Sequence, residues 1–202
     1  STLMRSSAAS DVYKRQFYDR VYRGSWNSLT VLSLSIGQGE LGCTPLQMAN
    51  MVATVANRGH YRTPHVVKRI HDRDSIDARF YVNHTTRVDA RWFEPIVEGM
   101  YQAVNGGGTG RIAMVPGLDI CGKTGTAENP RGRDHSTFLS FAPKDNPKIA
   151  ISVYVENGGF GASAALPIAS LLEEYYLTDT IRRPALLEHI KNMNIYYPSY
   201  DR

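Results

Sequence analysis

The segment GLDICGKTGT, residues 117–126, fits two structural patterns that exclude each other. Read from Gly117, it matches G-x-x-x-x-G-K-T, the loop whose backbone amides bind phosphate in nucleotide-binding enzymes. Read from Leu118, its apolar and polar residues alternate, which is typical of a β-strand. A phosphate-binding loop requires a helix that begins at Lys123, whereas a strand continues through this residue. The residues after Lys123 therefore decide between the two folds.

These residues do not favour a helix. Gly125, Pro130 and Gly132 lie where the helix would have to form, and glycine and proline both destabilise a helix interior. The downstream sequence also has no apolar strand ending in an aspartate that would hold magnesium. We therefore interpret residues 118–126 as a strand and keep a P-loop nucleotide-binding enzyme as an unfavoured alternative.

Two further strands are predicted at residues 137–142 and 148–155. Both faces of the second one are largely apolar, so we expect it to be covered on both sides. The short link between them, PKDNP, suits a hairpin but not a parallel crossover. The three strands should therefore form an antiparallel sheet.

Capping residues and 3.6-residue periodicity predict helices on either side of these strands in the sequence. Three of the predicted helices span residues 44–57, 163–177 and 185–192. The fourth starts between Asp89 and Phe93 and stops at residues 106–108. The helix at 44–57 has apolar residues on two faces, and we expect it to be buried on most sides. An antiparallel sheet flanked by helices is an α+β fold.

Composition limits the class of protein further. The chain has 202 residues, of which 42% are hydrophobic and 21% charged, which is typical of one globular domain. The net charge of +4 is spread rather than clustered, so we do not expect nucleic acid as a partner. Cys43 and Cys121 are too few and too far apart for a disulfide scaffold or a zinc site, and we expect both to be buried.

The residues Lys123-Thr124-Gly125-Thr126 have the chemistry that an acyl-transfer site needs. Lys123 supplies a cation near the nucleophile and the substrate carboxylate, and Thr124 or Thr126 supplies a hydroxyl that binds this carboxylate. Gly125 lets the backbone approach a ligand, so that an extended peptide can pair with the strand. The backbone N–H of Thr126 is a candidate oxyanion donor. K-T-G alone occurs often by chance, so the interpretation needs support from the flanking sequence.

The flanking sequence resembles the class B penicillin-binding proteins. The segment SIGQGELGCTPLQMANMVATVANRG, residues 35–59, and Pro64 resemble the I-G-Q-G, T-P-L-Q and A-N-x-G blocks of that family and the proline that follows them. CGKTGTAE at residues 121–128 and FAP at 141–143 also match in order and spacing. The block YDRVYRGSWN, residues 18–27, resembles the elongation type, penicillin-binding protein 2.

The resemblance covers residues 17–177 and implies a fold, an activity and partners. The fold is the C-terminal portion of a penicillin-binding/β-lactamase-like transpeptidase domain. The implied activity is peptidoglycan D,D-transpeptidation through a serine acyl-enzyme, without a metal or an organic cofactor. The implied partners are stem peptides ending in D-Ala-D-Ala, β-lactams and membrane proteins of the elongation machinery. The family is anchored in the cytoplasmic membrane, with its catalytic domain on the outer, periplasmic side.

The family's nucleophile lies in an S-x-x-K motif, and these 202 residues contain no such motif. Ser25-Trp26-Asn27 has the letters of the second family motif, but it lies too close to residues 36–40, so we interpret it as coincidence. We expect residues 1–16 to be a disordered or artefactual leader, 17–194 a partial transpeptidase domain and 195–202 a tail. The isolated chain should then be inactive; the alternative is a non-catalytic relative that binds peptidoglycan.

Overall fold

The structure is a computed structural model that describes residues 15–39, 42–71 and 76–195. Residues 1–14 of the predicted leader and 196–202 of the predicted tail lie outside the described ranges. The chain divides into two units, Ser1–Thr44 and Pro45–Arg202. All of the predicted strands and helices belong to the second unit.

The first unit contains two helices that the sequence analysis did not predict, α2 (Arg15–Val21) and α3 (Ser28–Ser35). Asn27 caps α3, because its side chain accepts a hydrogen bond from a backbone N–H of the first turn at 2.9 Å. Trp26 donates its indole N–H to Asp19 at 2.8 Å. The residues of the Ser25-Trp26-Asn27 motif therefore have local structural roles in this unit.

The second unit is built on a three-stranded sheet of β3 (Cys121–Ala127), β4 (His135–Ala142) and β5 (Ile149–Val155). Its order is β3-β4-β5, and both pairs are antiparallel, as the hairpin link predicted. Lys123 lies inside β3 opposite Leu139, and no helix begins there. The P-loop interpretation is therefore excluded.

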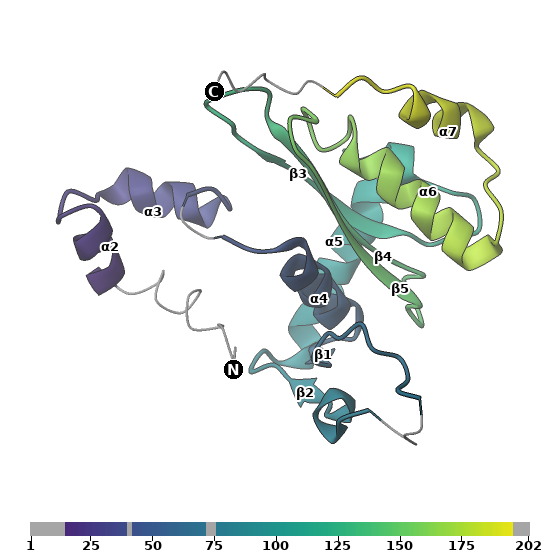
Figure 1. The fold of residues 1–202 in the computed structure, drawn as a ribbon, viewed down its shortest axis with the longest axis horizontal. Helices are drawn as coiled ribbons and strands as arrows, with labels where there is room; N and C mark the ends of the chain where they lie inside the picture. The colour runs from purple at the N-terminus through teal and green to yellow at the C-terminus, as the bar shows by residue number, and fades with distance from the viewer. Residues whose placement is uncertain (1–14, 40–41, 72–75, 196–202) are drawn as a thin grey trace. The chain divides into compact units, whose positions relative to one another are not determined.

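Helices cover both faces of this sheet (Figure 1). Helix α6 (Ala165–Thr178) packs on one face, and helices α4 (Pro45–Ala56) and α5 (Phe93–Asn105) pack on the other. Side chains of β4 alternate between the two cores, so that Phe138 packs with residues of α6 and Phe141 with residues of α4 and α5. The predicted α+β fold is confirmed.

The remaining elements lie at the periphery of the second unit. They are β1 (His60–Tyr61), η1 (Ala78–Tyr81), β2 (His84–Thr85), η2 (Ala90–Trp92), η3 (Arg111–Ala113) and α7 (Pro184–Lys191). Short β1 and β2 pair with each other in a separate antiparallel sheet. The observed bounds of the predicted helices and strands differ from the predicted ones by only a few residues.

Two expectations about burial were wrong. Helix α4 is not buried on most sides, because it contacts the sheet through one face, on which Val52 and Ala56 are buried. On its other faces Leu46 is 60% exposed and Met51 48% exposed. Of the two cysteines only Cys121 is buried, whereas Cys43 is exposed in the segment before α4.

Candidate active site

The four predicted site residues are consecutive on β3, which has a hydrogen-bonded neighbour, β4, on one side within the described chain. Their side chains alternate between the two faces of the sheet. Thr124 and Thr126 lie on the face covered by α6, and Lys123 and Gly125 lie on the opposite face. The strand therefore brings the four residues together without placing all four side chains on one face.

Lys123 is the exposed member of this group. Its ammonium group donates a hydrogen bond to the backbone carbonyl of Thr124 at 2.6 Å, across the edge of the strand. This contact keeps a positive charge at the outer edge of β3. A ligand that binds along this edge would therefore meet the cation and the strand backbone together.

The two threonine hydroxyls have different partners. Thr126 Oγ1 accepts a hydrogen bond from the backbone N–H of Gly161 at 3.2 Å. Thr124 Oγ1 lies 3.2 Å from Thr109 Oγ1, and either hydroxyl can donate. Thr126 is thus bound to the segment after β5, whereas Thr124 contacts an exposed side chain.

Gly125 and Gly161 allow two backbone segments to approach each other closely. A Cβ atom on Gly125 would lie 2.6 Å from Cγ2 of Thr137 on β4. A Cβ atom on Gly161 would overlap Gly125 O and lie 2.8 Å from Thr137 O. The sequence analysis explained the glycine at position 125 by the close approach of a ligand to the backbone. The structure gives a second reason, which is the close packing of Gly125 against Thr137 and Gly161. Gly161 was missed, although the glycine-rich NGGFG segment that follows β5 was a visible signal.

Ser136 holds the Gly161 segment against the sheet. Its fully buried hydroxyl lies 2.9 Å from Phe160 O and 3.1 Å from Gly161 O, to which it donates. The same oxygen accepts a hydrogen bond from the N–H of Ala165 at 2.9 Å, where α6 begins. The segment behind Thr126 is therefore fixed to β4 and to α6.

Asn129 and His135, for which the sequence suggested no role, brace the turn between β3 and β4. The Asn129 side chain donates to Asn157 Oδ1 at 2.9 Å and to Arg133 O at 3.2 Å. His135 Nδ1 accepts a hydrogen bond from the N–H of Asn157 at 3.0 Å. These contacts fasten the end of β3 to the residues that follow β5.

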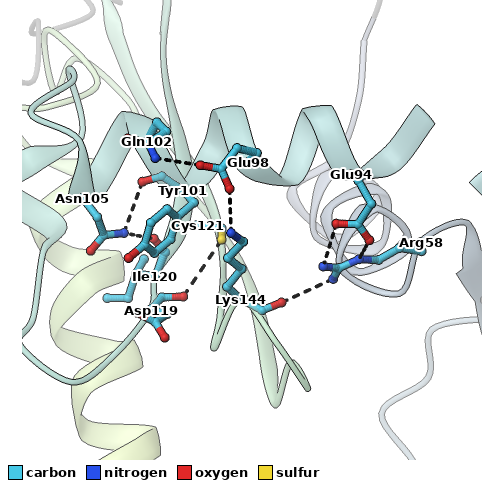
Figure 2. A network of polar contacts seen from close by, with 10 residues as sticks. All are labelled: Arg58, Glu94, Glu98, Tyr101, Gln102, Asn105, Asp119, Ile120, Cys121 and Lys144. Atoms are coloured by element: carbon cyan, nitrogen blue, oxygen red, sulfur yellow. Dashed lines mark hydrogen bonds and ion pairs between the residues drawn. The ribbon is translucent and has the colours of Figure 1, made fainter. Parts of the chain in front are cut away.

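Helix α5 fastens the other end of β3 (Figure 2). The side chain of Asn105, the last residue of α5, donates to Ile120 O at 2.9 Å and to Tyr101 O at 3.2 Å. Ile120 directly precedes β3. The start of the strand is therefore held at a fixed position relative to the helix.

The same helix is joined by ion pairs to the turn between β4 and β5 and to the end of α4 (Figure 2). Lys144 Nζ lies 2.6 Å from Glu98 Oε2, and Arg58 Nε lies 2.9 Å from Glu94 Oε1. The hydrogen bond from Lys144 lowers the pKa of the Glu98 carboxyl, and the one from Arg58 lowers the pKa of Glu94. The ammonium of Lys144 also lies 4.6 Å from the centre of the Tyr101 ring, a cation–π contact.

Cys121 lies at the start of β3 and has to be considered as a nucleophile. Burial raises the pKa of its thiol to about 12. The thiolate is the nucleophilic form of cysteine, so this group is unreactive near neutral pH. Cys121 therefore does not substitute for a serine nucleophile.

Comparison with known proteins gives the family that the chain matches. Residues 19–172 match the family described as penicillin binding protein transpeptidase domain. The peptidoglycan D,D-transpeptidase MrdA of Haemophilus influenzae is 33% identical in an alignment 198 positions long, which covers 88% of this chain and 30% of that protein.

Solved structures agree with this match. A crystal structure of Pseudomonas aeruginosa PBP2 has a TM-score of 0.70 and 37% identity, and the match covers 82% of this chain and 36% of that one. The penicillin G acyl-enzyme complex of penicillin-binding protein A from M. tuberculosis has a TM-score of 0.57 and 34% identity. This match covers 71% of this chain and 34% of that one. The chain thus spans about a third of the length of the proteins that it matches.

Proposed function

The chain belongs to the penicillin-binding protein transpeptidase family, and we propose that its β3 strand forms one wall of the acyl-transfer site of a peptidoglycan D,D-transpeptidase. The observation that carries the proposal is the K-T-G-T sequence on an outer strand whose lysine is exposed. We assign the cation to Lys123, the close backbone approach to Gly125 and the oxyanion-binding N–H to Thr126. The Thr126 hydroxyl faces the Gly161 segment, whose N–H donates to it, whereas the Thr124 hydroxyl lies beside the exposed side chain of Thr109, so we assign the substrate carboxylate to Thr124.

In the proposed reaction, a stem peptide ending in D-Ala-D-Ala lies extended along the free edge of β3. A serine in another part of the transpeptidase domain attacks the carbonyl of the penultimate D-Ala, and the last D-Ala leaves. An amine of a neighbouring stem peptide then attacks the ester carbonyl, which forms the cross-link and releases the serine. β-Lactams would acylate the same serine.

The whole protein would work at the cytoplasmic membrane, with this domain on the outer side and with membrane proteins of the elongation machinery as partners. Within the described residues, no helix combines the length and the apolar character that crossing a bilayer requires. We propose residues 17–194 as a partial transpeptidase domain, with residues 1–16 and 195–202 outside it.

Incubation of the 202-residue chain with a fluorescent penicillin should give no covalent label. The sequence has no S-x-x-K motif, and burial keeps the Cys121 thiol protonated, so we expect neither a serine of that motif nor this cysteine to form an acyl-enzyme. The measurement is denaturing gel electrophoresis with fluorescence detection. Penicillin-binding protein A from M. tuberculosis, which forms a penicillin G acyl-enzyme, is the positive control. A labelled band at the mass of this chain would contradict the proposal.

Lys123→Ala should reduce acylation strongly in a transpeptidase extended to include the nucleophile. Removal of an electrostatic group from a preorganised site costs about 10²–10³-fold in rate. The measurement is the second-order rate constant of acylation by the fluorescent penicillin. The matched control is Lys148→Ala, which also removes a lysine side chain but at the position directly before β5. This variant should leave the rate unchanged. Equal acylation rate constants of the Lys123→Ala and wild-type proteins would show that Lys123 has no role in acylation.

A further inference from the structure

The hydroxyl of Thr109 is held against the proposed carboxylate-binding residue. Its Oγ1 lies 3.2 Å from Oγ1 of Thr124, in the middle of β3. Thr109 belongs to the segment GGGTG, residues 106–110, which the sequence analysis considered only as the end of α5. Thr109 is exposed and Thr124 is partly exposed, so the contact lies at the surface of the second unit.

The segment that carries Thr109 is packed tightly on the last turn of α5. A Cβ atom on Gly108 would lie 2.8 Å from the Cα atom of Ala103, and one on Gly110 would lie 3.0 Å from Ala103 O. The N–H of Gly110 donates to the same carbonyl at 2.8 Å. These approaches are possible only because the two residues lack side chains. Thr109 is therefore held in place relative to α5.

The other side of the contact is fixed as well. Asn105 joins α5 to Ile120, immediately before β3 (Figure 2). Thr124 is paired with Phe138, which is fully buried. The backbone positions of Thr109 and Thr124 are thus both fixed, which leaves the side-chain rotamers to bring the two hydroxyls into contact.

A threonine hydroxyl has one proton and two acceptor positions. When Thr109 donates to Thr124 Oγ1, the proton of Thr124 is available to a second acceptor. We propose that Thr109 is a positioning residue that fixes the Thr124 side chain in one rotamer and directs its proton toward the carboxylate of a stem peptide. The inference rests on the proposed function of β3 and names a residue outside the K-T-G-T sequence.

Two variants of the 202-residue chain test the inference. Thr109→Val keeps the branched shape but removes the hydroxyl, and Thr109→Ser keeps the hydroxyl but removes the methyl group. Three-bond scalar couplings measured by NMR give the rotamer populations of Thr124. We expect a single dominant rotamer in the wild-type and Thr109→Ser chains and a mixture in Thr109→Val. Because Thr109 is exposed, the midpoint of thermal unfolding should stay the same in all three.

Binding of acetyl-D-Ala-D-Ala gives a second readout, from the shifts of the β3 amide signals during titration. Loss of one hydrogen-bond donor should weaken binding by about fivefold in Thr109→Val and not in Thr109→Ser. An unchanged Thr124 rotamer and an unchanged affinity in Thr109→Val would show that the inference is wrong. If the wild-type chain does not bind the peptide, the proposed function fails. The rotamer populations of Thr124 still show in that case whether Thr109 positions the Thr124 side chain.

Discussion

Glu173→Gln should stabilise the fold by roughly 3 kcal/mol at pH 7, although it changes only one side-chain oxygen to nitrogen. Glu173 lies on α6 and is fully buried. Within the described residues, neither of its carboxyl oxygens forms a hydrogen bond. The hydroxyl of Ser140 is near enough to favour the ionised form, but it too lies outside hydrogen-bonding geometry. An unpartnered buried carboxylate is costly, so the folded protein keeps this group protonated.

The cost depends on pH in a defined direction. Burial raises the pKa of Glu173 from 4.5 to about 8, and Ser140 and Arg183 offset this only in part. Below pH 4.5 the group is protonated in both the folded and the unfolded chain, so it does not reduce stability. Between pH 4.5 and 8 only the unfolded chain releases the proton, and stability falls by about 1.4 kcal/mol per pH unit. Above pH 8 the loss is complete and constant.

Urea unfolding of the wild-type and Glu173→Gln chains at several pH values measures this effect. The two free energies of unfolding should agree near pH 4 and separate steadily up to pH 8. The neighbouring Glu174 provides the matched control, because it is also fully buried but pairs with Arg183 at 2.9 Å. Glu174→Gln should destabilise the fold by about 3 kcal/mol, since it removes the negative charge that pairs with the guanidinium of Arg183. Equal stabilities of wild-type and Glu173→Gln chains at pH 7.5 would disprove the assignment of a neutral Glu173.

Gly161→Ala should destabilise the fold by about 3 kcal/mol and disturb β3 directly. The added methyl group would overlap Gly125 O and lie 2.9 Å from Gly125 N and 2.8 Å from Thr137 O. All three are backbone atoms of paired strands, which cannot rotate away as the end of a side chain can. The segment after β5 would have to move, and its hydrogen bond to Thr126 would be lost.

Urea unfolding gives the change in stability of Gly161→Ala, and hydrogen exchange of the β3 amides shows where the disturbance lies. Exchange should become faster at Gly125 and Thr126 and change less in α7, which packs on α6. Gly99→Ala is the matched control, because Gly99 lies on the exposed face of α5 with open space around it. That variant should gain up to about 1 kcal/mol from helix propensity. A Gly161→Ala chain as stable as the wild type would contradict the observed packing.

Local sequence patterns predicted the second unit well because each pattern has a local physical cause. The bounds of α4 followed from Pro45 in its first turn and from Gly59, which has a positive φ, beyond its end. The short link before β5 required an antiparallel hairpin. Helix α3 was missed because SLTVLSLS has no 3.6-residue period, and its formation depends on the Asn27 cap. The exposed faces of α4 were not predictable either, since apolar periodicity shows which faces can be buried but not whether another element covers them.

The sequence by itself determined that Lys123, Thr124, Gly125 and Thr126 lie on a strand, that this strand belongs to an antiparallel sheet, and that no S-x-x-K serine accompanies them. These properties follow from the order of residues along the chain. Only the tertiary structure decided that Thr109 meets Thr124, that Gly161 packs on Gly125, and that the buried Glu173 carboxyl has no hydrogen-bond partner among the described residues. Such contacts join segments distant in the chain, and their energies depend on distance and burial, which no local pattern encodes.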